Sequence, residues 1–136
     1  MDTKRFMLAG KATFTVSNPE TGNHFTYRVR AKDIGEGRTL HFVQVLTGSD
    51  NESSYSYLGT IFGGTTYKHG RKSRIGESAP SARAFEWIFP RIIAGEDLKG
   101  ARVQHAGRCG RCGRKLTVPE SIETGFGPEC ASLLAA

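Results

Sequence analysis

The sequence predicts an α+β fold in which an antiparallel β-meander packs against one helix, with a small cysteine-containing module at the C-terminus. Three observations support this. The first seventy residues hold short runs of alternating apolar and polar residues separated by turn formers. A later segment repeats apolar residues at helical spacing, and all three cysteines follow residue 105. We therefore expect an α+β body over residues 1–100 and the module over residues 101–136.

The predicted sheet begins with a hairpin. Apolar and polar residues alternate over 11–17 and over 25–31, and the turn formers Asn, Pro and Gly occupy 18–23 between them. The run 39–47 is apolar on both faces, as in a central strand, and lies between polar loops at 32–38 and 48–54. The further strands that we expect are residues 55–62, a short strand at 65–67, and residues 101–105 after the helix.

A single helix is predicted over residues 80–94. Pro80 suits its first turn, and the apolar residues at spacing i, i+3, i+4, i+7 are Phe85, Ile88, Phe89 and Ile92. Pro90 lies inside this pattern and lacks the N–H that a helix interior uses, so we expect a kink or break near Phe89. Gly95 is expected to close the helix. One helix on one face of a sheet is an α+β arrangement.

The cysteines and one histidine form the pattern H-x3-C-x2-C-x17-C. Its members are His105, Cys109, Cys112 and Cys130. Two thiols separated by two residues, with two more soft or borderline ligands at a distance, are typical of a closed structural zinc site. Glycine after each of the first two cysteines suits the tight turn of such a knuckle. The motif predicts one structural Zn²⁺ ion, and three thiolates with a neutral imidazole leave the site a net charge of about −1.

The residues after the knuckle predict two short helices. Thr117 and Glu120 have the spacing of a capping box, with Gly125 at the end of the first helix. Pro128 then begins a helix that runs to about residue 134. Cys130 falls in the first turn of that helix, where the positive end of the helix dipole favours a thiolate.

Other interpretations of the cysteines remain open. A redox C-x-x-C pair would normally accompany a βαβ pattern, which is absent, and a disulfide would suit a secreted protein. The N-terminal residues contain no apolar run of signal-peptide length. His105 is the weakest ligand, and a water molecule in its place would make the zinc site look catalytic. The alternative residues for the fourth position are Glu129, His24, His41 and His69.

The residues from His105 to Ala131, and above all the phrase GRCGRCGRKLTVPESIETGFGPEC, resemble a small zinc-ribbon segment that recurs in bacteriophage and mobile-element proteins. The resemblance covers about a fifth of the chain. It implies a treble-clef-like zinc ribbon held by three cysteines and a histidine, or by something close to a four-cysteine set. It also implies a bacteriophage or prophage origin, and it leaves the binding partner open.

Composition points to a soluble protein with a basic second half. The chain of 136 residues has a formal net charge of +6. Residues 1–66 hold seven Lys/Arg against six Asp/Glu, whereas residues 67–136 hold twelve against seven. No apolar run approaches membrane-spanning length, so we expect no membrane association. With no signal peptide in evidence, we expect a cytoplasmic location, in an infected bacterial host if the chain is phage-derived.

No catalytic constellation is visible, so we expect a binding protein and no enzyme. Nucleic acid, with DNA favoured, is the first candidate partner, bound through phosphate contacts by one basic tract. The residues expected to form the tract are Lys68, Arg71, Lys72, Arg74, Arg108, Arg111, Arg114 and Lys115, with Arg28 and Arg30 as further candidates. Tyr55 or Tyr57 beside these arginines would stack bases, although alternating aromatic residues more often belong to a core.

A protein partner is the alternative. A basic surface also suits an acidic protein, such as a host or phage nucleic-acid-processing or defence complex that this chain would bind or inhibit. A solvated basic face without a partner is the third interpretation. The sequence does not indicate an oligomeric state.

Overall fold

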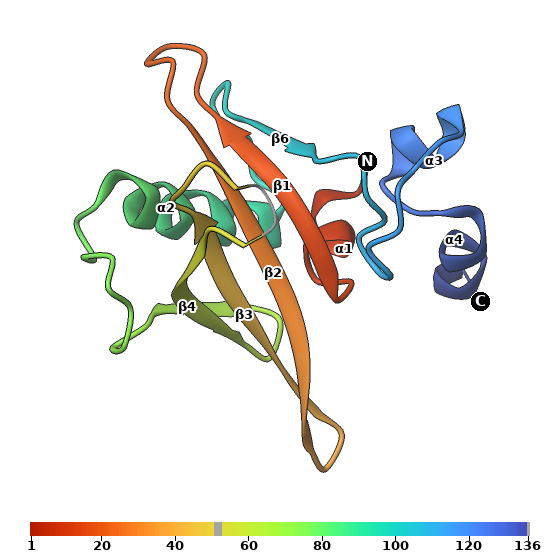
Figure 1. Ribbon diagram of the computed structural model, residues 1–136, viewed down its shortest axis with the longest axis horizontal. Coiled ribbons are helices and arrows are strands. Elements are labelled where there is room, and N and C mark those ends of the chain that lie inside the picture. The colour runs from red at the N-terminus through yellow and green to blue at the C-terminus, as the bar shows by residue number, and fades with distance from the viewer. Residues whose placement is uncertain (51–52, 136) are drawn as a thin grey trace.

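The computed structural model describes residues 1–50 and 53–135, and shows an α+β fold built on a six-stranded antiparallel sheet (Figure 1). The strands lie in the order β5-β4-β3-β2-β1-β6, so the first five form the predicted meander and the last pairs with β1. Their bounds are β1 Lys11–Ser17, β2 His24–Gly35, β3 Arg38–Leu46, β4 Tyr55–Phe62, β5 Thr66–His69 and β6 Arg102–His105.

Within the described residues, four helices accompany the sheet: α1 Thr3–Met7, α2 Pro80–Ala94, α3 Pro119–Thr124 and α4 Pro128–Ala135. The long helix α2 lies behind the sheet in Figure 1 and covers one of its faces. Phe85 of α2 packs on Tyr27 of β2 and Tyr67 of β5, with ring centroids 5.1 and 4.7 Å away. The Tyr27 hydroxyl donates to the Ser81 carbonyl at 2.7 Å, and burial raises the pKa of Tyr27. No helix in the described part of the chain is long and apolar enough to span a membrane.

The hairpin of β2 and β3 is longer than the sequence predicted. The expected loop at 32–38 is wrong, because β2 continues to Gly35 and β3 begins at Arg38. Only Glu36 and Gly37 form the turn, both with positive φ. The strands here project beyond the sheet, as Figure 1 shows, so they bury no side chains and lack the alternating pattern that marks a strand in sequence. The predicted loop at 48–54 includes residues 51–52, which lie outside the described residues, as does residue 136 of the module.

The predicted helix is confirmed with its expected bounds, and of the kink or break expected near Phe89 the break is wrong. Helix α2 runs through Pro90 as one element and ends at Gly95, whose φ of 70° gives the expected left-handed cap. Because Pro90 has no N–H, the carbonyl of Glu86, four residues earlier, lacks its helical donor. Both residues are exposed. The carbonyl therefore faces water, which offsets the missing hydrogen bond and lets the helix continue.

Helix α1, which the sequence did not predict, connects the sheet to the C-terminal segment. Its Phe6 is fully buried, with its ring 5.9 Å from that of Phe126. The backbone N–H of Lys11 donates to the Gly110 carbonyl at 2.7 Å, and that of Ala106 donates to the Thr13 carbonyl at 3.0 Å. The predicted boundary at residue 100 thus falls just before β6, a strand of the body's own sheet.

Candidate metal centre and basic cleft

The three cysteines come together in the C-terminal segment. The Sγ atoms of Cys109, Cys112 and Cys130 all lie within 4.8 Å of one another, and no disulfide joins them. Tetrahedral zinc–thiolate bonds of about 2.3 Å place sulfurs about 3.8 Å apart, so a shift of about 1 Å or less would bring this triad onto one ion. Cys109 and Cys130 are buried and Cys112 is half-buried. A cysteine cluster that could hold a metal ion, as the C-x2-C-x17-C spacing predicted, is therefore present in the fold.

Local hydrogen bonds prepare the knuckle for thiolates. Burial raises the pKa of the Cys109 thiol, but backbone N–H groups of Gly127, Cys112 and Arg111 and the thiol of Cys112 outweigh it and lower the pKa to about 7. The backbone folds tightly here, since the N–H of Gly113 donates to the Cys109 carbonyl at 2.9 Å. Gly113 has a φ of 79°, which glycine adopts without strain.

Arg111 is the knuckle arginine that faces the sulfurs. Its Nη1 donates to the Cys130 Sγ at 3.6 Å, and this hydrogen bond raises the pKa of Arg111 above its ordinary value. Burial and the neighbouring thiols of Cys112 and Cys109 raise the pKa of Cys130, although the Arg111 hydrogen bond lowers it. A guanidinium at this distance compensates the net negative charge that a metal with three thiolates carries.

His105 lies outside the cysteine cluster. Its Nδ1 accepts from the backbone N–H of Gly107 at 2.9 Å, and its Nε2 contacts the carbonyl of Ile122. The ring also packs 5.8 Å from Phe6. Strand β6 therefore places His105 at the edge of the C-terminal segment. In this structure the histidine does not join the three cysteines as a fourth ligand.

The other candidates for a fourth ligand are also outside the cluster. Glu129 is adjacent to Cys130 in sequence but does not join the group, and within the described residues no further His, Asp or Glu belongs to it. His41 is engaged elsewhere, because its Nε2 contacts the carbonyl of Leu8 at 3.0 Å. His69 likewise contacts the carbonyl of Ile75 at 2.9 Å. The sequence alone did not reveal these local partners.

The two short helices have the expected ends, except for the capping box. Helix α3 ends at Gly125 in the left-handed conformation, and Cys130 lies in the first turn of α4, both as predicted. The N-cap of α3 is Val118, with no side-chain cap, so the Thr117–Glu120 capping box is wrong. Pro119 at the first helical position explains the shift, since it holds the preceding residue extended and needs no N–H partner.

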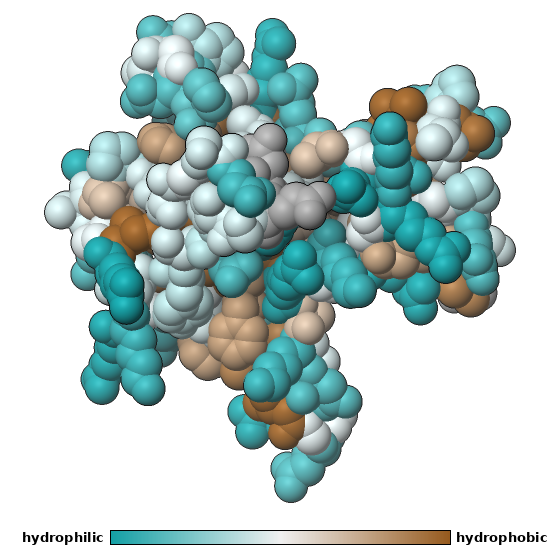
Figure 2. Space-filling model, viewed as in Figure 1, coloured by the Kyte–Doolittle hydropathy of each residue, from teal (hydrophilic) through white to brown (hydrophobic). Residues whose placement is uncertain are grey.

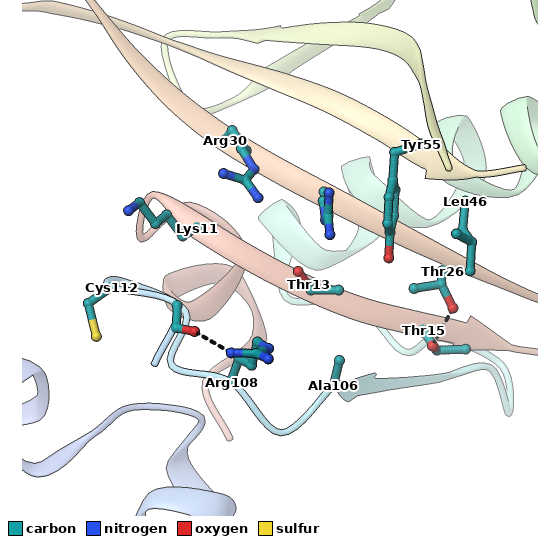
Figure 3. A pocket seen from close by; sticks show the side chains of 12 residues that line it. Lys11, Thr13, Thr15, Thr26, Arg30, Leu46, Tyr55, Ala106, Arg108 and Cys112 are labelled. Atoms are coloured by element: carbon teal, nitrogen blue, oxygen red, sulfur yellow. Dashed lines mark hydrogen bonds between the residues drawn. The ribbon is translucent and has the colours of Figure 1, made fainter. Parts of the chain in front are cut away.

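A basic cleft of about 670 Å³ lies beside the knuckle, on the face of the sheet opposite α2. Its cationic lining residues are Lys11, Arg28, Arg30 and Arg108 (Figure 3). Hydroxyl groups of Thr13, Thr15, Thr26 and Tyr55 also line it, and none of its described lining residues is acidic. The guanidinium of Arg28 lies 3.8 Å from the centroid of the Tyr55 ring. Arg108 reaches the cleft from the knuckle, and its Nη1 donates to the Gly113 carbonyl at 3.2 Å.

The predicted basic tract is divided between opposite edges of the sheet, so the expectation of one continuous tract is wrong. Lys68 belongs to β5, at one edge, and the exposed Arg71, Lys72 and Arg74 follow it. The knuckle follows β6, at the other edge. It carries the exposed Arg108, Arg111, Arg114 and Lys115. Arg28 and Arg30 line the same cleft as Arg108, as the sequence allowed. Their strand β2 is separated from β6, which precedes the knuckle, by β1 alone.

Lys11 is the cleft residue that the sequence did not single out. It is the first residue of β1, and its position beside Arg30 follows from the pairing of β1 with β2. The alternation of β1 places Lys11, Thr13 and Thr15 on the face away from the core. That signal was in the sequence, but the contribution of the knuckle to the same cleft depends on the tertiary fold.

Comparisons with known proteins describe only the C-terminal segment. The model of a family of unknown function (DUF6011) matches residues 100–135, which include the cysteine cluster. No curated protein and no solved structure matches the chain. The match supports a small cysteine-rich segment, and it carries neither an activity nor a partner. The chain is thus similar to this family of unknown function from β6 to α4.

Proposed function

We propose that this protein binds nucleic acid, DNA in preference, through phosphate contacts in the basic cleft, and that it has no catalytic activity. The observation that carries the proposal is the cleft lining. It gathers lysine and arginine from β1, β2 and the knuckle, with no carboxylate among the described residues of its wall. Cations gathered in a concave surface attract a polyanion and release its counterions on binding.

The metal has a structural part in this proposal. Cys109, Cys112 and Cys130 would hold one Zn²⁺ ion, which fixes the knuckle as a cross-link and stabilises the thiolates. Arg108 lies one residue before Cys109, so a rigid knuckle keeps its guanidinium at the cleft. The treble-clef-like zinc ribbon and the phage origin belong to the same proposal, and rest on the resemblance of residues 105–131.

The proposal is tested by a salt titration of DNA binding with variants matched in charge. Lys11→Gln with Arg30→Gln removes two cleft cations that are exposed. Arg83→Gln with Lys99→Gln removes two exposed cations from α2 and the turn after it. The cleft pair should weaken binding about tenfold or more and reduce the log–log salt slope by roughly 2, whereas the control pair should change neither.

A third pair tests the separate basic loop at the other edge. Arg71→Gln with Arg74→Gln should weaken binding less than the cleft pair, because the loop does not line the cleft. Absence of DNA binding at low salt, or binding without a salt slope, would refute the phosphate mechanism. An acidic protein partner, the alternative function, would then remain, and the same cleft variants would test it.

A further inference from the structure

We infer that the ligand of this face is single-stranded DNA, with its phosphates over a cationic stripe and its bases over an aromatic stripe; the inference rests on the proposed function. The cationic stripe consists of Lys11, Arg28, Arg30 and Lys32 on β1 and β2. The aromatic stripe consists of Phe42, Tyr55, Tyr57 and Phe62 on β3 and β4. The two stripes lie side by side on the face that α2 leaves uncovered.

Strand alternation and register place all eight side chains on this face. On β2 the buried Tyr27 and Val29 point toward α2, so Arg28 and Arg30 point the other way. Directly paired residues share a face, and Arg30 pairs with Phe42. The pairing of β3 with β4 then adds Tyr55 opposite Leu46, Tyr57 opposite Gln44 and Phe62 opposite Leu40. A β-bulge opposite Val43 and Gln44 adds one residue to β4. Tyr57 and Phe62, which lie on either side of this bulge, therefore face the same side of the sheet.

The aromatic stripe is not a closed core. Phe62 is 42% exposed, and the other three rings are half-buried. The rings are held in place by one another and by polar partners. Phe42 and Tyr57 pack edge to face with centroids 6.4 Å apart, and the Tyr57 hydroxyl is 2.7 Å from that of Thr60. Figure 2 shows brown side chains exposed over the region of β3 and β4 beside teal, hydrophilic ones.

Cations also border the far side of the aromatic stripe. Lys68 on β5 pairs with Thr60, which places it on the same face, and its Nζ lies 6.0 Å from the centroid of the Phe62 ring. The rings are thus flanked by positive charge on both sides. Charge and ring faces side by side match a ligand with an anionic edge and flat apolar groups.

Single-stranded nucleic acid has this pair of features at the right separation. Neighbouring strands of a sheet are about 4.8 Å apart, so a backbone along β2 puts its bases over β3 and β4. Base stacking on aromatic rings is the common mode of single-strand binding and tolerates any sequence. In a duplex the base faces are already stacked on each other, so the aromatic stripe would gain nothing from it.

DNA is the expected form of the strand. The hydroxyls of Thr15 and Thr26, which line the cleft, are 2.7 Å apart and bonded to each other. This bond uses one of the two hydroxyl protons, so a 2′-hydroxyl, the group by which proteins recognise RNA, could meet only the remaining proton and lone pairs of the pair. Phosphate contacts and stacking, the two interactions that the face does offer, need no 2′-hydroxyl.

The test compares three probes on the full-length protein by fluorescence anisotropy: a short oligo(dT), an oligo(rU) of the same length, and a blunt duplex of the same length. We expect oligo(dT) to bind more tightly than the duplex and at least as tightly as oligo(rU). Phe62→Ala should weaken oligo(dT) binding by roughly 5- to 150-fold, the loss of one stacked base, and leave the salt slope unchanged. Phe62→Tyr keeps a ring and should retain the affinity.

Ile34→Ala is the matched control, because Ile34 is 43% exposed at the tip of the β2–β3 hairpin and lies outside the stripe. It should leave oligo(dT) affinity unchanged. The single-strand inference would be overturned if the duplex bound more tightly, or if a folded Phe62→Ala variant kept its affinity for oligo(dT). If binding still weakened with salt in either case, the proposed function would stand. Tighter binding of oligo(rU) would overturn the choice of DNA. If no probe binds at low salt, both proposals fail.

Discussion

Gly110 offers a sharp test of how the N-terminus and the cysteine knuckle pack. A Cβ at this position would lie 2.6 and 2.7 Å from two carbons of the Phe6 ring and 3.1 Å from the Phe6 carbonyl. Gly110 has no positive φ, so Gly110→Ala introduces a steric clash without backbone strain. The backbone cannot move away freely, because the Gly110 N–H donates to Gly125 at 2.9 Å and its carbonyl accepts from Lys11 at 2.7 Å.

The expected cost of Gly110→Ala follows from overpacking. Phe6 is fully buried, so its ring must leave its preferred position or the knuckle must shift, which costs about 1–3 kcal/mol. Phe6→Ala removes the clashing Cδ and Cε atoms, and in that background Gly110→Ala should cost less than about 0.5 kcal/mol. The difference is a coupling energy between α1 and the knuckle.

Urea unfolding of the four proteins of this cycle, each loaded with zinc, measures the coupling. Gly127→Ala is the matched control in the same segment, since a Cβ there meets no atom within 4 Å and its free energy of unfolding should change by less than about 0.5 kcal/mol. Equal costs of Gly110→Ala with Phe6 and with Ala at position 6 would show that α1 does not pack on the knuckle as described.

Three further predictions concern the metal centre and the core. Elemental analysis should find about one zinc per chain. The zinc should be lost in Cys112→Ser but retained in His105→Ala, because His105 lies outside the cluster. Equal loss of zinc in both variants would show that His105 enters the coordination sphere. Zinc affinity by chelator competition should fall as the pH drops through about 7, where protons compete for the Cys109 thiolate, whereas a flat profile between about pH 8 and 6 would contradict thiolate ligation. Tyr27→Phe should lower the free energy of unfolding by about 0.5–1.5 kcal/mol, because the hydrogen bond from the buried ring to the half-buried Ser81 is lost; an unchanged urea midpoint would argue against that bond.

Most of the sheet was predictable from the sequence, because a strand with one buried face alternates apolar and polar residues. Strand β4 has the expected bounds, and β1 and the buried half of β2 follow their alternation. The outer half of β2 has no such period, because it packs against nothing, and was predicted as a loop. Helix α2 was equally visible, and only its continuation through Pro90 was not predicted, although Pro90 and Glu86 lie off the apolar face of the pattern.

The candidate site was predictable where its parts are local. The spacing of the cysteines predicted the triad, and Pro128 placed Cys130 at the start of α4. The basic cleft was only partly predictable, because Lys11, Arg30 and Arg108 come from β1, β2 and the knuckle and meet through the pairing of β1 with both of its neighbours. The same pairing order separates the 68–74 loop from the knuckle, which charge counting along the chain cannot reveal.

Binding of nucleic acid to the uncovered face of the sheet can be tested by mapping the binding site residue by residue. Amide chemical-shift changes should be recorded on the zinc-loaded protein during titration with oligo(dT). We expect the changes to concentrate on β1 to β4 and around Arg108, with little change in α2. Changes centred on α2 and the groove around Trp87, on the opposite face, would contradict the account.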